Sequence, residues 1–182
     1  MCANLGASFA LLRKRTIVLE LDLRKPALAE TLNIEAGSGV SEVIEGGADL
    51  GEVIIEVPQF NGYYHILTAG AVASSPSELI SSEAMHLLIE DLKGQYEVII
   101  IDTPPMSLVT DATLLQQYAD TSILVLRQGY SFTKVYKELK QRRKRFAEHP
   151  LNIVLNGYGK NKKYENRYEK MGYKNGYYTA KS

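Results

Sequence analysis

Two stretches of sequence decide the fold: TIVLELDLRKP at residues 16–26 and EVIIIDTPP at residues 97–105. Each begins with apolar, mostly β-branched residues that show no polar alternation. Such runs are typical of strands buried on both faces of a parallel sheet. The sequence predicts four strands of this kind, at Thr16–Leu21, Glu97–Asp102, Thr121–Arg127 and Leu151–Asn156. A weaker hairpin or extra strand is expected over residues 53–57 and 63–68.

Helical patterns separate these strands. They cover residues 26–33, 76–93, 110–118 and 131–147. Strands that alternate with helices predict an α/β fold, with a mostly parallel sheet flanked by helices. Ser75, Pro76 and Glu78 suit the N-cap, first and third positions of a helix. Leu5 and Phe9 are spaced as on a helix face, so another helix is expected to begin almost at Met1.

Length and composition restrict the class of protein. The chain has 182 residues, of which 45% are hydrophobic and 23% charged. These values are ordinary for a globular domain and exclude a wholly disordered or collagen-like chain. Cys2 is the single cysteine, so no internal disulfide can form and a reducing compartment is expected. The formal net charge is zero and predicts no partner.

The last 26 residues differ from the rest in composition. Residues 157–182 hold seven Lys and Arg against two Glu, a balance of about +5, and six of the twelve tyrosines. Aliphatic residues are almost absent, so this stretch cannot build a core. The sequence therefore predicts a folded domain over residues 1–156 and a flexible tyrosine-rich tail over residues 157–182.

Acidic side chains stand where two of the predicted strands end. Glu20 and Asp22 close the first strand, and Asp102 closes the second. Open α/β sheets bind ligands at the carboxyl ends of their strands. Mg²⁺ prefers oxygen ligands and needs only one or two carboxylates beside nucleotide phosphates. The pattern favours a magnesium–nucleotide site, and the alternative is a set of solvated surface carboxylates.

Together the motifs resemble the bacterial tyrosine kinases. The resemblance rests on ELDLRKP, IIIDTPP, TDATLLQQYADTSILVLRQG at residues 110–129, IVLNGYG at residues 153–159 and the tyrosine-rich tail. It extends over about residues 1–178. These kinases are cytoplasmic autokinase domains of capsular and exopolysaccharide systems, and they are P-loop ATPases related to the MinD/ParA type.

The resemblance implies roles for individual residues. Asp102 matches the Walker B aspartate, which would hold Mg²⁺ directly or through water. Glu20 and Asp22 match the paired acids of the Walker A′ motif, where the first acid helps to activate the attacking tyrosine hydroxyl. This sequence has Glu20 where the commoner residue is Asp. Arg24 would meet phosphate or orient the acids, and Asn156 would lie near the nucleotide base. The implied cofactors are ATP and Mg²⁺.

The resemblance also implies phosphate acceptors and partners. The acceptors would be the tail tyrosines, phosphorylated between neighbouring subunits of a homo-oligomer: Tyr158, Tyr164, Tyr168, Tyr173, Tyr177 and Tyr178. Further partners would be a polysaccharide co-polymerase membrane protein, or a fused upstream half of that kind, and a tyrosine phosphatase. No nucleic acid is expected. The implied location is the cytoplasm, at the inner face of the cell membrane.

One family motif is missing from the printed sequence. No G-x-x-x-x-G-K-[ST] loop, which cradles nucleotide phosphates, occurs in it. The sequence therefore predicts a P-loop ATPase-like domain without its first strand and loop, inactive when alone. Two alternatives remain open: a non-catalytic oligomer partner that accepts phosphate, and a MinD/ParA-like ATPase.

Overall fold

The computed structural model describes residues 1–35, 37–105, 111–128 and 150–157. The chain divides into two compact units, Met1–Leu114 and Leu115–Ser182, and each is described by itself. The predicted helix at 131–147 and the predicted tail both lie outside the described residues, apart from Gly157. The predicted boundary at residues 156 and 157 therefore stays a prediction.

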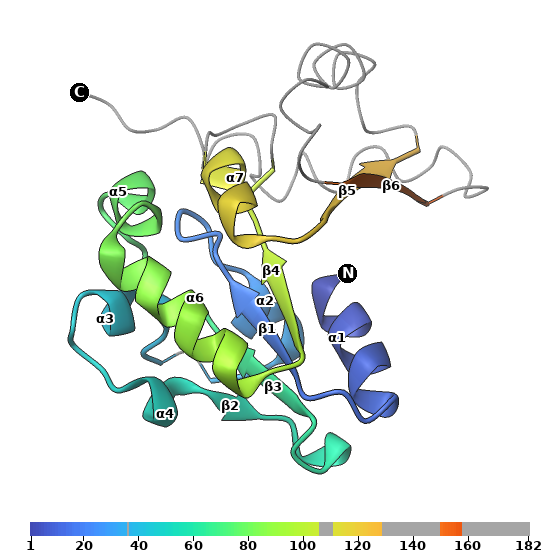
Figure 1. Cartoon of the computed structure of the whole chain (residues 1–182), viewed down its shortest axis with the longest axis horizontal. Helices are drawn as coiled ribbons and strands as arrows, with labels where there is room; N and C mark the ends of the chain where they lie inside the picture. Colours follow the sequence, from blue (N-terminus) through green and yellow to red (C-terminus); the bar gives the residue numbers. More distant parts are fainter. Residues whose placement is uncertain (36, 106–110, 129–149, 158–182) are drawn as a thin grey trace. The chain divides into compact units, whose positions relative to one another are not determined.

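The first unit is built on a four-stranded sheet in the order β2-β3-β1-β4 (Figure 1). The central strand β1 (Thr16–Glu20) pairs in parallel with β3 (Tyr64–Leu67) on one side and β4 (Val98–Asp102) on the other. The short strand β2 (Ile55–Glu56) pairs antiparallel with β3. The structure thus confirms a mostly parallel sheet, and the weaker hairpin at residues 53–68 is present.

Seven α-helices and one 3-10 helix accompany this sheet within the described part of the first unit. They are α1 (Cys2–Leu11), α2 (Leu28–Leu32), α3 (Val40–Ile44), α4 (Leu50–Val53), η1 (Pro58–Phe60), α5 (Pro76–Ile80), α6 (Glu83–Gln95) and α7 (Asp111–Leu114). The early helix expected from the first residues is confirmed as α1. The short helices α3 and α4 were not predicted, because four or five residues do not complete a helical hydrophobic pattern.

The prediction of one helix over residues 76–93 was wrong, because the chain breaks between α5 and α6. Ser82 is the N-cap of α6, and its hydroxyl accepts a hydrogen bond from the Met85 N–H at 3.1 Å. Ser75 does occupy the N-cap position of α5, ahead of Pro76. Its side chain makes no capping hydrogen bond.

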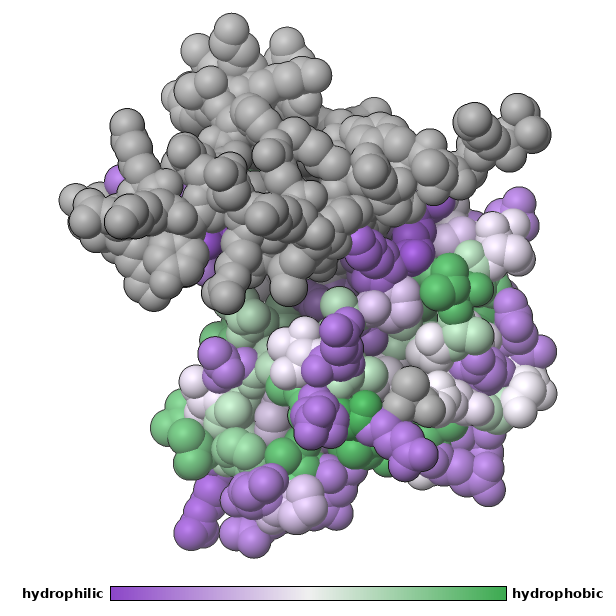
Figure 2. All heavy atoms as spheres, turned by 180° about the vertical axis from the view of Figure 1, so that it is seen from behind, coloured by the Kyte–Doolittle hydropathy of each residue, from purple (hydrophilic) through white to green (hydrophobic). Residues whose placement is uncertain are grey.

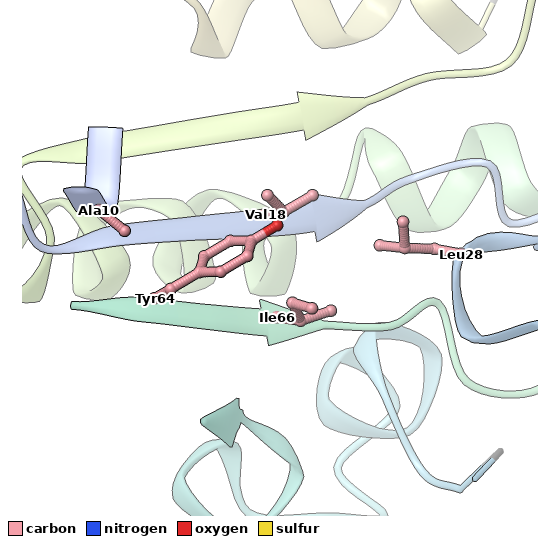
Figure 3. Close-up of a cluster of buried hydrophobic side chains, with 5 residues drawn as sticks. All are labelled: Ala10, Val18, Leu28, Tyr64 and Ile66. Carbon is pink, nitrogen blue, oxygen red and sulfur yellow. The ribbon is translucent and has the colours of Figure 1, made fainter. Parts of the chain in front are cut away.

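The core lies on both faces of the sheet. On one face, Val18 of β1 packs with Tyr64 and Ile66 of β3, Ala10 of α1 and Leu28 of α2 (Figure 3). The alternate residues of β1 point to the opposite face, which α6 covers (Figure 1). Strand β1 is buried at all five positions, as its unbroken apolar run predicts. Burying each Leu or Ile of such a strand contributes about 1.5–3 kcal/mol.

The second unit contains a 3-10 helix, η2 (Leu115–Tyr118), and two strands. β5 (Ser122–Arg127) and β6 (Leu151–Asn156) pair in parallel over their whole length. Both strands lie within the ranges that the sequence predicts, and their parallel pairing agrees with the predicted sheet type. The prediction that they are buried on both faces was wrong, because Ile123, Val125, Ile153 and Leu155 are 43–55% exposed.

The surface of the first unit carries scattered apolar side chains. Among the described residues of this unit, the exposed large hydrophobic ones are Met1, Leu11, Leu12, Val72 and Leu87. Figure 2 shows one face, on which hydrophobic and hydrophilic residues are interspersed. Scattered exposure of this kind is normal and indicates no docking surface. Among the described residues, no helix combines the length and the apolar character that crossing a membrane requires.

Candidate functional site

The predicted acidic residues meet at one edge of the sheet. In the parallel pairing of β1 with β4, Glu20 lies opposite Asp102. The next N–H along the chain, that of Leu21, donates to the Asp102 carbonyl at 2.8 Å. Both strands therefore run into their loops side by side (Figure 1). This is the carboxyl edge, where open α/β sheets bind ligands.

Glu20 is the most deeply enclosed of these acids, with 1% of its surface exposed. Its Oε1 accepts hydrogen bonds from the N–H groups of Ala27 and Leu28, each at 2.7 Å. Its Oε2 accepts one from the Ala69 N–H at 3.1 Å. These three bonds join the end of β1 to the start of α2 and to the loop after β3. The expected role of Glu20 in activating a tyrosine stays a prediction.

Asp22 follows in the loop after β1 and is 7% exposed. Its Oδ1 accepts the Lys25 N–H at 3.1 Å, a short-range bond of the kind that aspartate makes in turns. The turn brings the chain from β1 toward Pro26 and α2. Asp22 is thus held two residues beyond the strand end, close in sequence to the β1–β4 edge.

Arg24 is bound to an aspartate that the motif analysis assigned no role. Its Nε donates to Asp111 Oδ2 at 2.6 Å, and its Nη2 donates to Asp111 Oδ1 at 3.2 Å. Ser77 completes the cluster: its hydroxyl donates to Asp111 Oδ1 at 2.8 Å and accepts from Arg24 Nη2 at 3.1 Å. The cluster joins the loop after β1 to the first turns of α5 and α7.

Asp111 is 1% exposed, so its charge depends on these partners. Burial alone would raise the pKa of its carboxyl group. The hydrogen bonds from Arg24 and Ser77, with the charge of Arg24, outweigh burial and hold that pKa below its usual value. In the sequence, Asp111 is visible only as part of TDAT, at the start of the predicted helix 110–118. Nothing in that pattern reveals that its partner is Arg24, 87 positions away.

Asp102 is half-buried and has a thiol as neighbour. The Cys2 Sγ, at the start of α1, donates to Asp102 Oδ1 at 3.0 Å. Burial, followed by the charge of Asp102 and this hydrogen bond, raises the pKa of the Cys2 thiol to about 12. The thiol therefore stays protonated at neutral pH and acts as a donor to the carboxylate.

The loop after β3 also contacts the acids at this edge of the sheet. Its residues Ala69 and Ala71 donate N–H groups to Glu20 and to Glu42, the latter at 3.0 Å. Glu42 also accepts the Gly39 N–H at 2.7 Å. Burial opposes ionisation of Glu42, but these two bonds outweigh it and lower its pKa. Gly70 has a φ of +77°, and a Cβ there would collide with the Glu42 carboxylate, so the turn requires glycine.

The donor set suits a magnesium ion that keeps most of its own water. Asp22 and Asp102 supply carboxylate oxygens, the ligands that Mg²⁺ prefers. Within the part of the chain that the structure describes, no group of three or more His, Cys, Asp or Glu could form a metal cage. One or two carboxylates are what Mg²⁺ uses when substrate phosphates provide further ligands. The sequence contains no G-x-x-x-x-G-K-[ST] loop that could cradle those phosphates.

The remaining predicted site residues lie elsewhere. Asn156 ends β6 in the second unit, is exposed, and its Oδ1 accepts the N–H of Gly157 at 2.8 Å. Asn156 belongs to a different unit from the acids, so its expected place near a nucleotide base stays a prediction. The six tail tyrosines lie outside the described residues.

This α/β domain, with a mostly parallel sheet and acids at its carboxyl edge, has a fold of the P-loop nucleoside triphosphatase type. Solved structures support this class. MinD from Pyrococcus horikoshii, complexed with Mg-ADP, matches with a TM-score of 0.65 and 26% identity, covering 88% of this chain and 65% of MinD. The kinase domain of VpsO matches with a TM-score of 0.77 and 35% identity, covering 84% of this chain and 74% of that domain.

Relatives in sequence define the family more narrowly. The chain is 31% identical over 154 residues to the tyrosine-protein kinase CpsD of Streptococcus pneumoniae, covering 84% of this chain and 67% of CpsD. It is 31% identical over 157 residues to the tyrosine-protein kinase Ptk of Acinetobacter johnsonii, but spans only 20% of Ptk. No family model matches the chain. The chain belongs to the bacterial tyrosine kinases, as the motifs predict.

Proposed function

We propose that this chain takes part in phosphoryl transfer from ATP to protein tyrosines, in a system that makes and exports capsular polysaccharide or exopolysaccharide. The observation that carries the proposal is the pairing of β1 with β4. It brings the Asp22 loop and Asp102 to the same edge of the sheet. Membership in the bacterial tyrosine kinases supports the reaction class.

In this proposal, two of the acids bind the metal ion and two other residues support the site. Asp102 and Asp22 would hold Mg²⁺ directly or through its water. Bound there, Mg²⁺ would neutralise charge on the nucleotide phosphates. Arg24, which Asp111 and Ser77 hold on two sides, orients the loop that carries Asp22. Asn156 contributes near the nucleotide base.

The tail tyrosines are the proposed phosphate acceptors. Residues 157–182 carry a charge of about +5 from seven basic and two acidic residues. Each phosphate adds about −1.5 to −2 charges, so three or four phosphates would reverse the sign of the tail. Such a reversal would weaken contacts between neighbouring subunits that depend on the basic tail.

The partners and the location follow from the same family proposal. The domain would assemble with further copies of itself and with a polysaccharide co-polymerase membrane protein, or with a fused upstream half of that kind. A tyrosine phosphatase would remove the phosphates. The same proposal includes a location in the cytoplasm, at the inner face of the membrane.

A second candidate function rests on the printed sequence. It contains no G-x-x-x-x-G-K-[ST] loop, and phosphoryl transfer depends on the positioning and charge that such a loop supplies. We therefore propose that these 182 residues alone are inactive and serve as a phosphate acceptor for a neighbouring subunit that has the loop. A MinD/ParA-like ATPase remains the third candidate, and the tyrosine-rich tail argues against it.

The test is the intact mass of the 182-residue chain after incubation with Mg-ATP. One sample contains the chain alone, and the other adds a kinase of the same family with a complete P-loop. We expect phosphate only in the mixture and only on tail tyrosines. A variant with the six tail tyrosines changed to Phe should gain none. Phosphate gained alone would refute the predicted inactivity, and no phosphate on the folded chain in either sample would refute the acceptor function.

A further inference from the structure

We propose that Glu20 is a positioning residue, whose carboxylate locks the loop after β1 to the loop after β3 and thereby fixes Asp22. This inference rests on the proposed function, because it concerns the loop that carries a proposed Mg²⁺ ligand. It starts from the three hydrogen bonds of Glu20, which reach two segments distant in sequence: residues 27–28 and residue 69.

The first segment is the start of α2, which has no capping side chain of its own. The N-cap residue is Ala27, one of the poorest residues for that position because it offers no acceptor. The N–H groups at a helix start need partners from outside the helix. Glu20 Oε1 supplies the acceptor for both Ala27 and Leu28, at 2.7 Å each. The side chain of Glu20, seven residues before Ala27, thus caps α2.

The second segment is the loop after β3. Glu20 Oε2 accepts the Ala69 N–H at 3.1 Å, and Glu42 holds the adjoining Ala71 N–H at 3.0 Å. Glu20 therefore holds the N–H before Gly70, and Glu42 holds the N–H after it. The positive φ of Gly70 makes the turn between them. Through Glu20, this turn is tied directly to the loop that carries Asp22.

Both oxygens of Glu20 are engaged at 1% exposure. A carboxylate has about four acceptor sites, and three of them are filled by backbone N–H groups. One acceptor site is left, but at 1% exposure it is closed to solvent, so the surrounding loops would have to move before the hydroxyl of an incoming tyrosine could reach it. Asp22 Oδ1 accepts the Lys25 N–H, within the same loop.

The length of the side chain is essential to this arrangement. Aspartate at position 20 would be shorter by one methylene group, about 1.5 Å of chain. With the backbone unchanged, its carboxylate would no longer lie within hydrogen-bond distance of the start of α2. Glutamine has the full length and keeps one carbonyl oxygen. The proposal therefore predicts that glutamine replaces Glu20 better than aspartate does, although aspartate keeps the charge.

The test is residue-specific amide hydrogen exchange in the 182-residue chain without nucleotide, for Glu20→Gln, Glu20→Asp and a matched control, Glu30→Gln. Glu30 lies in α2 and is exposed, so its change should alter no amide in the two loops. In Glu20→Asp, exchange at Ala27 and Leu28 should rise about ten- to a hundredfold, the range for hydrogen bonds to a charged group. Exchange at Lys25, whose N–H is bound to Asp22, should rise with them.

In Glu20→Gln, exchange at Ala27, Leu28 and Lys25 should stay within about threefold of the parent chain. The amide nitrogen of glutamine then faces the N–H of Ala69, so exchange there should increase. Equal exchange in all variants would overturn the proposal. So would faster exchange throughout the first unit, since that would show a general loss of stability. No step needs ATP, so failure of the chain to gain phosphate in the mixture with a complete kinase would refute the proposed function without affecting this result.

Discussion

The cluster of Arg24, Ser77 and Asp111 offers the sharpest test of how the loop after β1 is held. The change is Asp111→Asn, which keeps the shape of the side chain and removes its charge. The Asp111 side chain is 1% exposed and that of Arg24 is 30% exposed. The variant would leave the guanidinium partly buried without its counter-charge, and would place an amide group where the carboxylate accepted the Arg24 Nε–H at 2.6 Å.

The expected cost follows from this burial. Removing one partner of a fully buried ion pair costs about 3–5 kcal/mol. Because water still reaches part of Arg24, we expect the free energy of unfolding of the first unit to fall by about 2–3 kcal/mol. Ser77→Ala removes only the hydroxyl of the cluster and should cost about 1 kcal/mol. The control is Glu90→Gln, at the exposed Lys93 pair in α6, which should leave stability unchanged.

The assay is urea unfolding of the full chain followed by far-ultraviolet circular dichroism and tyrosine fluorescence, since the chain has no tryptophan. With an m-value of about 2 kcal/mol/M, the Asp111→Asn midpoint should fall by about 1–1.5 M at unchanged slope. An Asp111→Asn midpoint equal to that of Glu90→Gln would refute the reasoning. It would mean that the cluster does not hold the loop.

Three further predictions concern the same unit. The pKa of Asp111 is held below its usual value of about 3.9 in the folded protein. Its contribution to stability is therefore complete above that pH and is lost as the pH falls through the lower pKa of the folded state. Urea midpoints should drop in acid, and less so in Asp111→Asn. Gly6→Ala should cost about 1–3 kcal/mol, since a Cβ there lies 2.7 Å from a β1 side chain, whereas Gly94→Ala, with nothing within 4 Å, should be neutral or stabilising in the same assay. The Cys2 thiol, with a pKa of about 12, should react with iodoacetamide at pH 8 at least about a hundredfold more slowly than free cysteine, and Asp102→Asn should speed the reaction; equal rates would contradict the Cys2–Asp102 contact.

Strand β1 could be predicted from the sequence because it is buried at all five positions, and β4 because it is half-buried throughout. Thr16–Glu20 and Val98–Asp102 each carry an apolar run up to the closing acid, a pattern that is typical of a covered parallel strand. Strand β3 was harder to recognise, since Tyr64–Leu67 has only four residues and includes a histidine. The break between α5 and α6 was missed because both helices show apolar residues in similar spacing, and the serine at position 82 was not recognised as a second helix start.

The site residues could be located, but their partners could not. Acids at strand ends are visible in the sequence, and the structure does bring Glu20 and Asp102 side by side. The bonds that define their environment are non-local: Arg24 to Asp111 across 87 positions and Cys2 to Asp102 across 100. The enclosure of Glu20 also depends on backbone N–H groups, which carry no signal in the side-chain sequence.

The central claim is that Mg²⁺ binds at the carboxyl edge of β1 and β4. The most direct measurement is titration of the chain with Mn²⁺, a paramagnetic substitute for Mg²⁺, while the backbone amide signals are followed by nuclear magnetic resonance. The account predicts that the signals next to Asp22 and Asp102 broaden first, recover on addition of excess Mg²⁺, and resist broadening in Asp102→Asn. Broadening that begins at exposed acids such as Glu90 and Glu97, with the strand ends unaffected, would contradict it.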